Sequence, residues 1–270
     1  MPRDKTIVAI HQPNFFPWLG YFNKIAYADV FVILDSVQFS KTGGTWSNRV
    51  RLKVKGKAKW VTVPVARAYH GVRRIEEMRF SRSDWRPSVL RTLQSAYGRT
   101  RHFDAVFPLV AKLISNPTDV LVEYNLAAIR ALTAALRLDS AEFVLASSLA
   151  VAGKGTDLLV AVVKGVRGTA YLCGSGASGY QEDAKFPKAG IDLIHQDFCH
   201  PAYQQGSGEF IAGLSIVDAL MNCGFEETQA LVLSSHPAVL PQAARQFSQP
   251  GSTDAERVSG VGVWNRADGQ

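Results

Sequence analysis

The sequence predicts an α/β fold built on a mostly parallel sheet with flanking helices, and its first 35 residues carry most of that prediction. Two apolar runs, at 7–10 and 30–34, are rich in valine and isoleucine, which is typical of strands buried on both faces. The segment between them, about 18–28, has apolar residues at helical spacing. A strand–helix–strand unit places its two strands parallel, so the predicted fold is Rossmann-like.

Two further regions are predicted between this unit and residue 140. Residues 49–54 and 60–65 flank a lysine-rich turn around Gly56 and predict an inserted β-hairpin. The spacing of apolar residues over 84–137 predicts a central helical segment, which Asp84 is suited to begin as an N-cap.

Strands and helices alternate again in the second half of the chain. We therefore expect one α/β domain over 1–226, with possible sub-lobes at 1–104 and 105–226, and a weakly helical to disordered tail over 227–270. The predicted strands are 142–146, 169–172 and 191–194, and the predicted helices are 154–166 and 214–223.

Composition is that of a globular protein with a sizeable core, since 47% of the residues are hydrophobic and 20% are charged. No run of 18 apolar residues is present, so no membrane span is expected. The three cysteines form no even set and have no zinc-ligand spacing, which predicts reduced thiols in the cytoplasm and no bound metal or other cofactor.

The chain is basic, with a formal net charge of +7 at pH 7. Solvated lysines at the hairpin tip are one interpretation of this charge. The other is attraction of an anionic partner, such as a nucleotide or an acidic carrier protein. No RNA-binding module motif is present and basic charge alone does not specify DNA, so no nucleic-acid partner is expected.

Polar residues end four of the predicted strands, at His11, at Asp35, at Ser147 with Ser148, and at Cys173. Parallel strands end at the same edge of a sheet, which is where open α/β sheets bind ligands. A histidine, a carboxylate and a thiol can together form an activated nucleophile. His11 would then be the general base, Asp35 would orient it, and Cys173 would be the nucleophile. The alternative is that each polar residue only ends a strand.

A second histidine and a second thiol compete with these candidates. His200 lies in a predicted loop beside Cys199, so either pair could supply the base and the nucleophile. A loop histidine next to proline can equally stabilise a turn.

Candidate substrate-binding residues surround two of the predicted loops. Arg49, beside Asn48 and close to Trp46, is suited to bind a phosphate or carboxylate because its guanidinium bonds two oxygens at once. Lys41 lies in a glycine-containing loop that could close over a ligand. Gly174 and Ser175 follow a strand and precede a helix, where free backbone N–H groups favour an anion.

The chain resembles the WbqC-like protein family over about residues 5–226. The resemblance rests on a series of motifs in order: HQPNFFPWLGYFNKI at 11–25, DVFVILDSVQFSK at 29–41, WSNRVR at 46–51, WVTVPV at 60–65, SSLAVAGKGTDLL at 147–159, YLCGSGASGY at 171–180, HPAYQQ at 200–205 and FIAGLSIVDALMNCG at 210–224.

This resemblance implies a place in O-antigen, other glycan or secondary-metabolite pathways, with acyl or aminoacyl transfer to an amine as the activity. Serine is common in the family where this chain has Cys173, so a thiol nucleophile would be particular to this chain. Carried onto this sequence, the family's polar motif positions are His11, Gln12, Asn14, Asp35, Gln38, Lys41, Asn48, Arg49, Thr156, Tyr203 and Gln205.

We therefore expect a transferase that moves an activated acyl or aminoacyl group to an amine. Its partner would be a thioester, either a small molecule or bound to a carrier protein. A nucleotide-dependent transferase or ligase is the alternative enzyme, because the strand–HQPN–helix start is faintly similar to nucleotidylyltransferases, although the second histidine of that signature is absent. A binding or scaffold protein of glycan assembly is the non-catalytic alternative.

Overall fold

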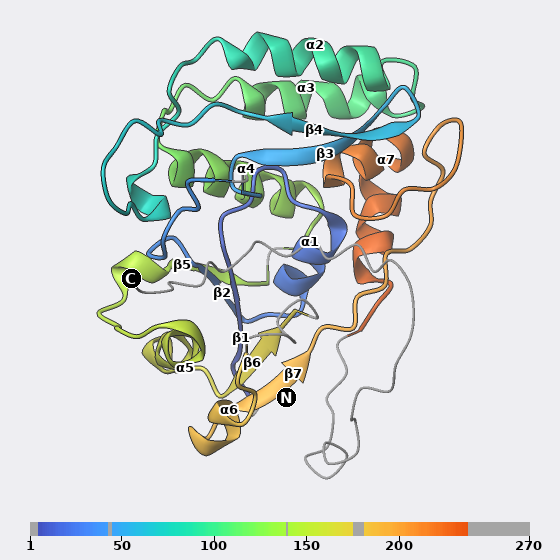
Figure 1. Ribbon diagram of the computed structural model, residues 1–270. Coiled ribbons are helices and arrows are strands. Elements are labelled where there is room, and N and C mark those ends of the chain that lie inside the picture. Colours follow the sequence, from blue (N-terminus) through green and yellow to red (C-terminus); the bar gives the residue numbers. More distant parts are fainter. Residues whose placement is uncertain (1–4, 43–44, 139, 175–180, 237–270) are drawn as a thin grey trace, which may run out of the picture.

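The predicted fold class is confirmed by the computed structural model, which describes residues 5–42, 45–138, 140–174 and 181–236 (Figure 1). A five-stranded parallel sheet is flanked by helices, and an antiparallel hairpin forms a separate two-stranded sheet. The parallel sheet has the order β5-β2-β1-β6-β7. Its strands are β1 (Ile7–His11), β2 (Val30–Ile33), β5 (Glu142–Leu145), β6 (Ala170–Cys173) and β7 (Asp192–His195).

The chain reverses its direction of travel across the sheet at β1. It runs from β1 outward to β2 and β5, then returns to form β6 and β7 on the other side of β1. In the register, Val8 is paired with Val30 on β2 and with Tyr171 on β6. This reversal makes the C-terminal ends of β1 and β6 the topological switch point, where sheets of this type bind ligands.

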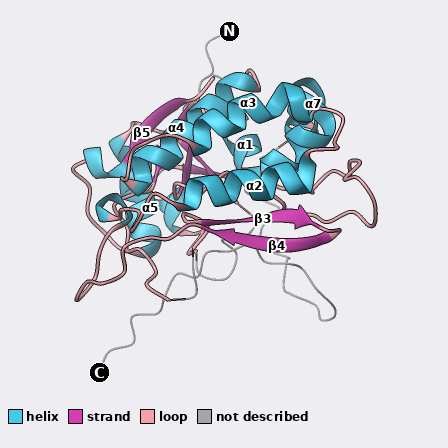
Figure 2. Ribbon diagram, turned by 90° about the horizontal axis from the view of Figure 1, so that it is seen from above, coloured by secondary structure: helices cyan, strands magenta, loops and turns pink. Residues whose placement is uncertain are grey.

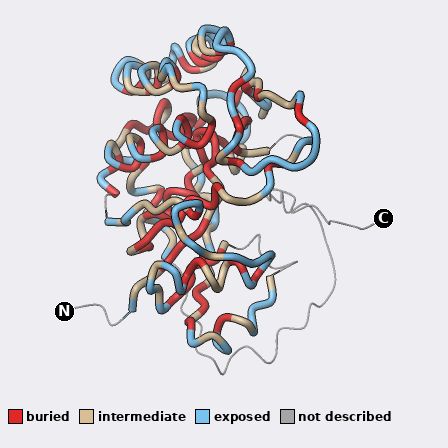
Figure 3. Tube along the Cα trace, turned by 90° about the vertical axis from the view of Figure 1, so that its left-hand side faces the viewer, coloured by how far each residue is buried: buried red, intermediate tan, exposed pale blue. Residues whose placement is uncertain are grey.

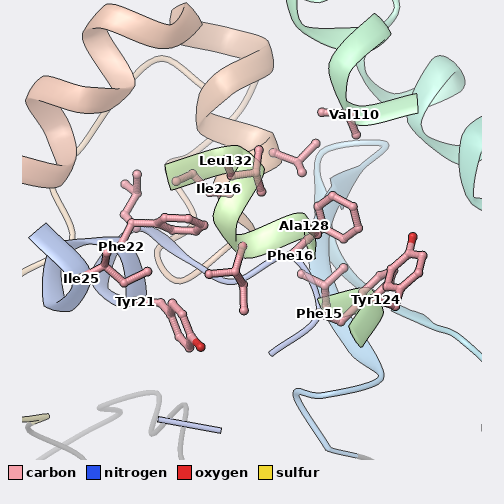
Figure 4. Packing of buried hydrophobic residues seen from close by; sticks show 14 of the residues in the cluster. Phe15, Phe16, Tyr21, Phe22, Ile25, Val110, Tyr124, Ala128, Leu132 and Ile216 are labelled. Atoms are coloured by element: carbon pink, nitrogen blue, oxygen red, sulfur yellow. The ribbon is translucent and has the colours of Figure 1, made fainter. Parts of the chain in front are cut away.

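Helices cover both faces of the sheet, and the pleat divides the strand residues between two cores. On one face, Ala9, Phe31 and Leu172 join the larger core, to which α1 (Leu19–Ala26), α4 (Leu121–Ala135) and α7 (Ile216–Leu233) contribute. Figure 4 shows part of this packing, and Figure 3 shows the buried layer running through the molecule. On the other face, Val8, Val32 and Tyr171 pack with α5 (Gly155–Gly165) and α6 (Lys185–Lys188).

A long insertion between β2 and β5 holds the predicted hairpin. Its strands are β3 (Arg49–Val54) and β4 (Lys57–Thr62), joined by Lys55 and Gly56 with positive φ angles of 52° and 75°. Such a two-residue turn matches the twist of the strands. The predicted turn was too long, because β4 begins at Lys57 rather than at residue 60. Lys57 and Lys59 therefore lie on the strand and not at a tip.

The predicted central helical segment is confirmed as α2 (Trp85–Tyr97), α3 (Phe103–Ile114) and α4, and a short 3-10 turn, η1 (Ile75–Glu77), precedes them. Figure 2 shows the hairpin next to α2, and the Lys53 N–H of β3 donates to the Tyr97 hydroxyl of α2 at 3.1 Å. Asp84 does stand at the N-cap position of α2, but its carboxylate pairs with Arg82 at 3.0 Å and makes no cap hydrogen bond.

The last helix continues beyond its predicted end. Ser215 caps α7 by accepting a hydrogen bond from the Val217 N–H at 3.2 Å. The helix is broken at Gly224 (φ 77°), yet it resumes and ends at Leu233. No helix among residues 5–42, 45–138, 140–174 and 181–236 has both the length and the apolar character to cross a bilayer. Of the tail predicted as weakly helical to disordered over 227–270, the part to Leu233 belongs to α7, and residues 237–270 lie outside the described residues.

Candidate active site

Cys173 ends β6 and contacts an imidazole that no sequence motif marked. Its Sγ lies 3.4 Å from Nδ1 of His195, the last residue of β7. The register pairs these two residues directly, so their side chains leave the same face of the sheet. The other ring nitrogen, Nε2 of His195, lies 3.6 Å from Oδ2 of Asp183. A thiol, an imidazole and a carboxylate thus stand in a row at one sheet edge.

The carboxylate of this row is held by its own neighbour. Gln181 Nε2 donates a hydrogen bond to Oδ1 of Asp183 at 2.8 Å, which leaves Oδ2 for the imidazole. The thiol has no exposed surface, and burial raises the pKa of Cys173 to about 11 against the opposing effect of the Lys24 charge. The thiol is therefore protonated at neutral pH, and a base is needed to make it nucleophilic.

Lys24 is a buried amine beside the thiol. It lies on α1, is 4% exposed, and donates from Nζ to the carbonyl oxygen of Ile10 at 3.2 Å. Burial lowers the pKa of Lys24 to about 8. A Cβ on Gly174 would stand 3.9 Å from this Nζ, so the glycine keeps the space above the end of β6 free of a side chain. Lys24 thus places a positive charge at neutral pH beside the end of β6.

Replacing Lys24 by methionine is expected to stabilise the protein at pH 7 by about 2–3 kcal/mol, because the folded state then no longer holds a desolvated ammonium. The unfolded chain binds the Lys24 proton more tightly than the folded protein does. Stability of the parent should therefore rise relative to the variant between about pH 8, the pKa of folded Lys24, and about pH 10.4.

Urea unfolding of both proteins across that range measures the difference, which isolates Lys24 from the other titrating groups. The expectation would be contradicted if Lys24→Met were less stable than the parent at pH 7 and the stability difference between the two proteins were the same at pH 10.

His11 ends β1 but faces the opposite side of the sheet from Cys173. It lies on the α1 face with Ala9, where its ring centroid is 5.6 Å from Trp18 and 4.7 Å from Tyr21. Its Nδ1 is 3.1 Å from the carbonyl oxygen of Gln12. Burial, with the nearby Lys24 charge, lowers the pKa of His11 to about 3, so the imidazole is neutral. The predicted role of His11 as a base stays a prediction.

Asp35 lies at the same edge and is bound to the neighbouring strand end. Its Oδ1 accepts from the Ser147 N–H at 2.8 Å and its Oδ2 accepts from the Ser147 hydroxyl at 2.6 Å. The carboxylate is 1% exposed. These bonds tie the end of β2 to the end of β5, and they give Asp35 an evident structural role beside its predicted catalytic one.

His200, Tyr203 and Gln205 lie in the segment that follows β7. His200 is half-buried, and burial together with the charge of Arg51 lowers its pKa. The Tyr203 hydroxyl donates to Oδ1 of the buried Asp218 at 2.9 Å. Gln205 bonds the backbone of Ile211 twice, at 2.8 and 2.9 Å. These contacts fold the segment against β3 and α7.

Several predicted binding residues have their polar groups engaged by the backbone. Asn48 donates to the carbonyl oxygen of Val63 at 2.9 Å, and Lys41 donates to that of Tyr69 at 2.6 Å. Gln38 is exposed, Gln12 is half-buried, and Asn14 is buried with its Nδ2 unpaired among the described residues. Ser175 lies outside the described residues.

Trp46 and Arg49 belong to a row of side chains that starts at His11, in which neighbouring rings meet edge-on or tilted. Successive ring centroids are 5.6 Å apart for His11 and Trp18, 5.1 Å for Trp18 and Trp46, and 4.8 Å for Trp46 and Trp60. Arg49 lies over Trp60, with its Cζ 4.1 Å from the ring centroid. We call His11, Trp18, Trp46 and Trp60 the aromatic row. It connects the sheet edge to the hairpin.

Metal ligation is not indicated by the part of the chain that the structure describes. There, no group of three or more His, Cys, Asp or Glu side chains is placed to hold a metal ion.

Comparison with known proteins gives two matches. A family model described as "WbqC-like protein family" matches residues 12–230. A protein of Mycobacterium tuberculosis (strain ATCC 25618 / H37Rv), described as "Uncharacterized protein Rv1507c", is 30% identical over 223 residues, which cover 81% of this chain and 94% of that protein. No solved structure matches the chain.

Proposed function

The chain belongs to the WbqC-like protein family, and from that membership and the geometry at Cys173 we propose that it transfers an activated acyl or aminoacyl group from a thioester to an amine. The observation that carries the proposal is the contact of 3.4 Å between Cys173 Sγ and His195 Nδ1, with Asp183 behind the imidazole. Nucleophile, base and orienting carboxylate are the parts that covalent acyl transfer requires.

In the first half of the reaction, Cys173 Sγ attacks the carbonyl carbon of the donor thioester. His195 takes the thiol proton at Nδ1, so in the resting state its own proton is on Nε2, facing Asp183. The new C–Sγ bond forms as the donor C–S bond breaks. The proton then passes from His195 to the departing thiolate, and the acyl group remains on Cys173.

In the second half, the amine of the acceptor attacks the acyl carbon. A bond forms between carbon and nitrogen, the C–Sγ bond breaks, and the surplus amine proton returns through His195 to the Cys173 sulfur. The sum is thioester plus amine giving amide plus thiol, and the protein is regenerated. The ammonium of Lys24 would stabilise the oxyanion in both halves.

The direct test is formation of a covalent acyl adduct. Incubation with an N-acetylcysteamine thioester, followed by intact-mass measurement and peptide mapping, is expected to show one acyl group on Cys173. Because Cys173 has no exposed surface, an adduct would also show that the thiol becomes accessible to the donor.

Cys199 provides the internal control, since it is a free and exposed thiol. Acylation of Cys199 but not Cys173, or an adduct that persists in Cys173→Ala, would reject the covalent mechanism. Turnover that continues in Cys173→Ala would do the same.

A nucleotide-dependent ligase is the second candidate, and the strand order favours it. The order β5-β2-β1-β6-β7 places the loop that starts at His11 at the topological switch point. Release of pyrophosphate or ADP from a nucleoside triphosphate, dependent on both carboxylic acid and amine, would support this candidate over thioester transfer.

A further inference from the structure

The hairpin presents an aromatic and basic face toward the sheet edge. In the antiparallel register Arg51 is opposite Trp60, and Arg49 is its diagonal neighbour, so these three side chains leave the same face. The other face carries Leu52, which is buried, and its register partner Lys59. The two arginines are therefore gathered on the face where Trp60 continues the aromatic row.

The guanidinium of Arg49 has a hydrogen-bond donor that is unpaired among the described residues. Arg49 stacks on Trp60 at 4.1 Å, and its Nε is buried with no hydrogen-bond partner among the described residues. Trp60 is 44% exposed, so the outer end of the row is open to a ligand. The charge of Arg51 is close enough to lower the pKa of His200, and it adds to the positive potential.

An indole face alone fits a sugar or a nucleobase. Arg49, which lies over the indole and has a free donor, favours a ligand that also carries an anion, since its planar guanidinium matches phosphate oxygens. A nucleoside phosphate carries both a planar ring and the anion in one molecule. Nucleoside phosphates are also parts of the carriers of activated acyl groups and amino sugars, and the hairpin face suits such a carrier.

We propose that Arg49, Arg51 and the outer end of the aromatic row bind a nucleoside phosphate, which is part of one substrate of the transfer. This inference rests on the proposed function and names a substrate class for it. The base stacks on Trp60 and the phosphate bonds Arg49, while the remainder of the substrate follows the row toward the C-terminal edge that β1 shares with β6. The two sources of this chemistry are a coenzyme A-type donor and a nucleotide-linked acceptor.

The test is calorimetric titration of the full chain with adenosine 3′,5′-bisphosphate, for the donor, and with UDP, for the acceptor. Saturable binding of one of them is expected, weakened about tenfold or more in Trp60→Ala, the factor that loss of one base–aromatic stack gives. Arg49→Gln should weaken it similarly and reduce its salt dependence.

Lys59→Gln is the matched control, because it removes one positive charge from the same hairpin on the opposite face. Its affinity should stay within about twofold of the parent. Absence of saturable binding by both nucleotides would overturn the inference, as would equal weakening by Trp60→Ala and Lys59→Gln.

The experiments distinguish failure of the proposed function from failure of the nucleotide-binding inference. The acyl adduct on Cys173 is measured with a thioester that has no nucleotide, so its formation without nucleotide binding would overturn only the present inference. Binding that Trp60→Ala abolishes, without any adduct, would support the nucleotide site and overturn the covalent mechanism.

Discussion

Replacing His195 by alanine is expected to slow acylation of Cys173 by about 10²- to 10⁴-fold at neutral pH, the range that a positioned general base contributes. The physical reason is the state of the thiol. Burial raises the pKa of Cys173 to about 11, so without the imidazole only a small thiolate fraction remains to react. Single-turnover acylation, followed by intact mass, measures the rate.

The pH dependence of the acylation rate distinguishes loss of a general base from destabilisation of the fold. Between pH 6 and 8, below the Lys24 pKa of about 8, the thiolate fraction rises tenfold per unit because the thiol pKa is about 11. The rate in His195→Ala should rise at about that slope, whereas the parent should depend less steeply on pH. A variant with parental rate, or with a flat profile, would remove His195 from the mechanism.

Asp183→Asn is the companion variant for the same prediction. It keeps the size of the side chain but removes the negative charge 3.6 Å from His195 Nε2. We expect a smaller loss than in His195→Ala, because the base remains but its cation is less stabilised. If both variants unfold in urea with the stability of the parent, the losses in rate come from the reaction and not from the fold.

The second large effect is expected on stability, at Asp218. This carboxylate is fully buried near the start of α7 and accepts from the Tyr97 hydroxyl at 2.8 Å and the Tyr203 hydroxyl at 2.9 Å. Asp218→Ala leaves both hydroxyls without their acceptor. A loss of about 3–5 kcal/mol in the free energy of unfolding is expected, measured by urea titration.

Asp104→Ala is the matched control, because Asp104 is also an acidic residue in the first turn of a helix but is exposed. The helix-dipole contribution is common to both, so the difference reports burial and hydrogen bonding. Burial raises the pKa of Asp218, so the folded state binds its proton more tightly than the unfolded chain. The loss in Asp218→Ala should therefore grow as the pH falls toward 4. Equal losses at the two positions would refute the prediction.

The strands of the sheet were predictable because burial on both faces leaves a strong local signal. The valine- and isoleucine-rich runs marked β1 and β2, and the helix between them implied the parallel pairing that the register shows. Element ends were predicted less well. The last helix was predicted to end at residue 223, yet α7 continues to Leu233. A Cβ at Gly224 would stand 2.7 Å from Nδ1 of His102. This close packing leaves no room for a side chain at position 224, which explains why the residue is glycine.

The candidate site was predicted in part. Cys173 was selected because it follows an apolar run. His195 follows the predicted strand at 191–194 in the same way, and the same rule applied to every strand would have selected it. Lys24 had no such signal, since a lysine on a short helix is expected in solvent. Here α1 is buried between the sheet and α7, so its lysine is desolvated.

By itself, the sequence determined the α/β class, the parallel start and the sheet edge at which polar groups collect, because these depend on the periodicity of neighbouring residues. Only the tertiary structure decided which of those groups meet. Periodicity places a side chain on a face of its own strand, whereas the strand order and register decide what stands opposite. The pairing of β6 with β7 joined Cys173 to His195, and the pleat turned His11 toward the other core.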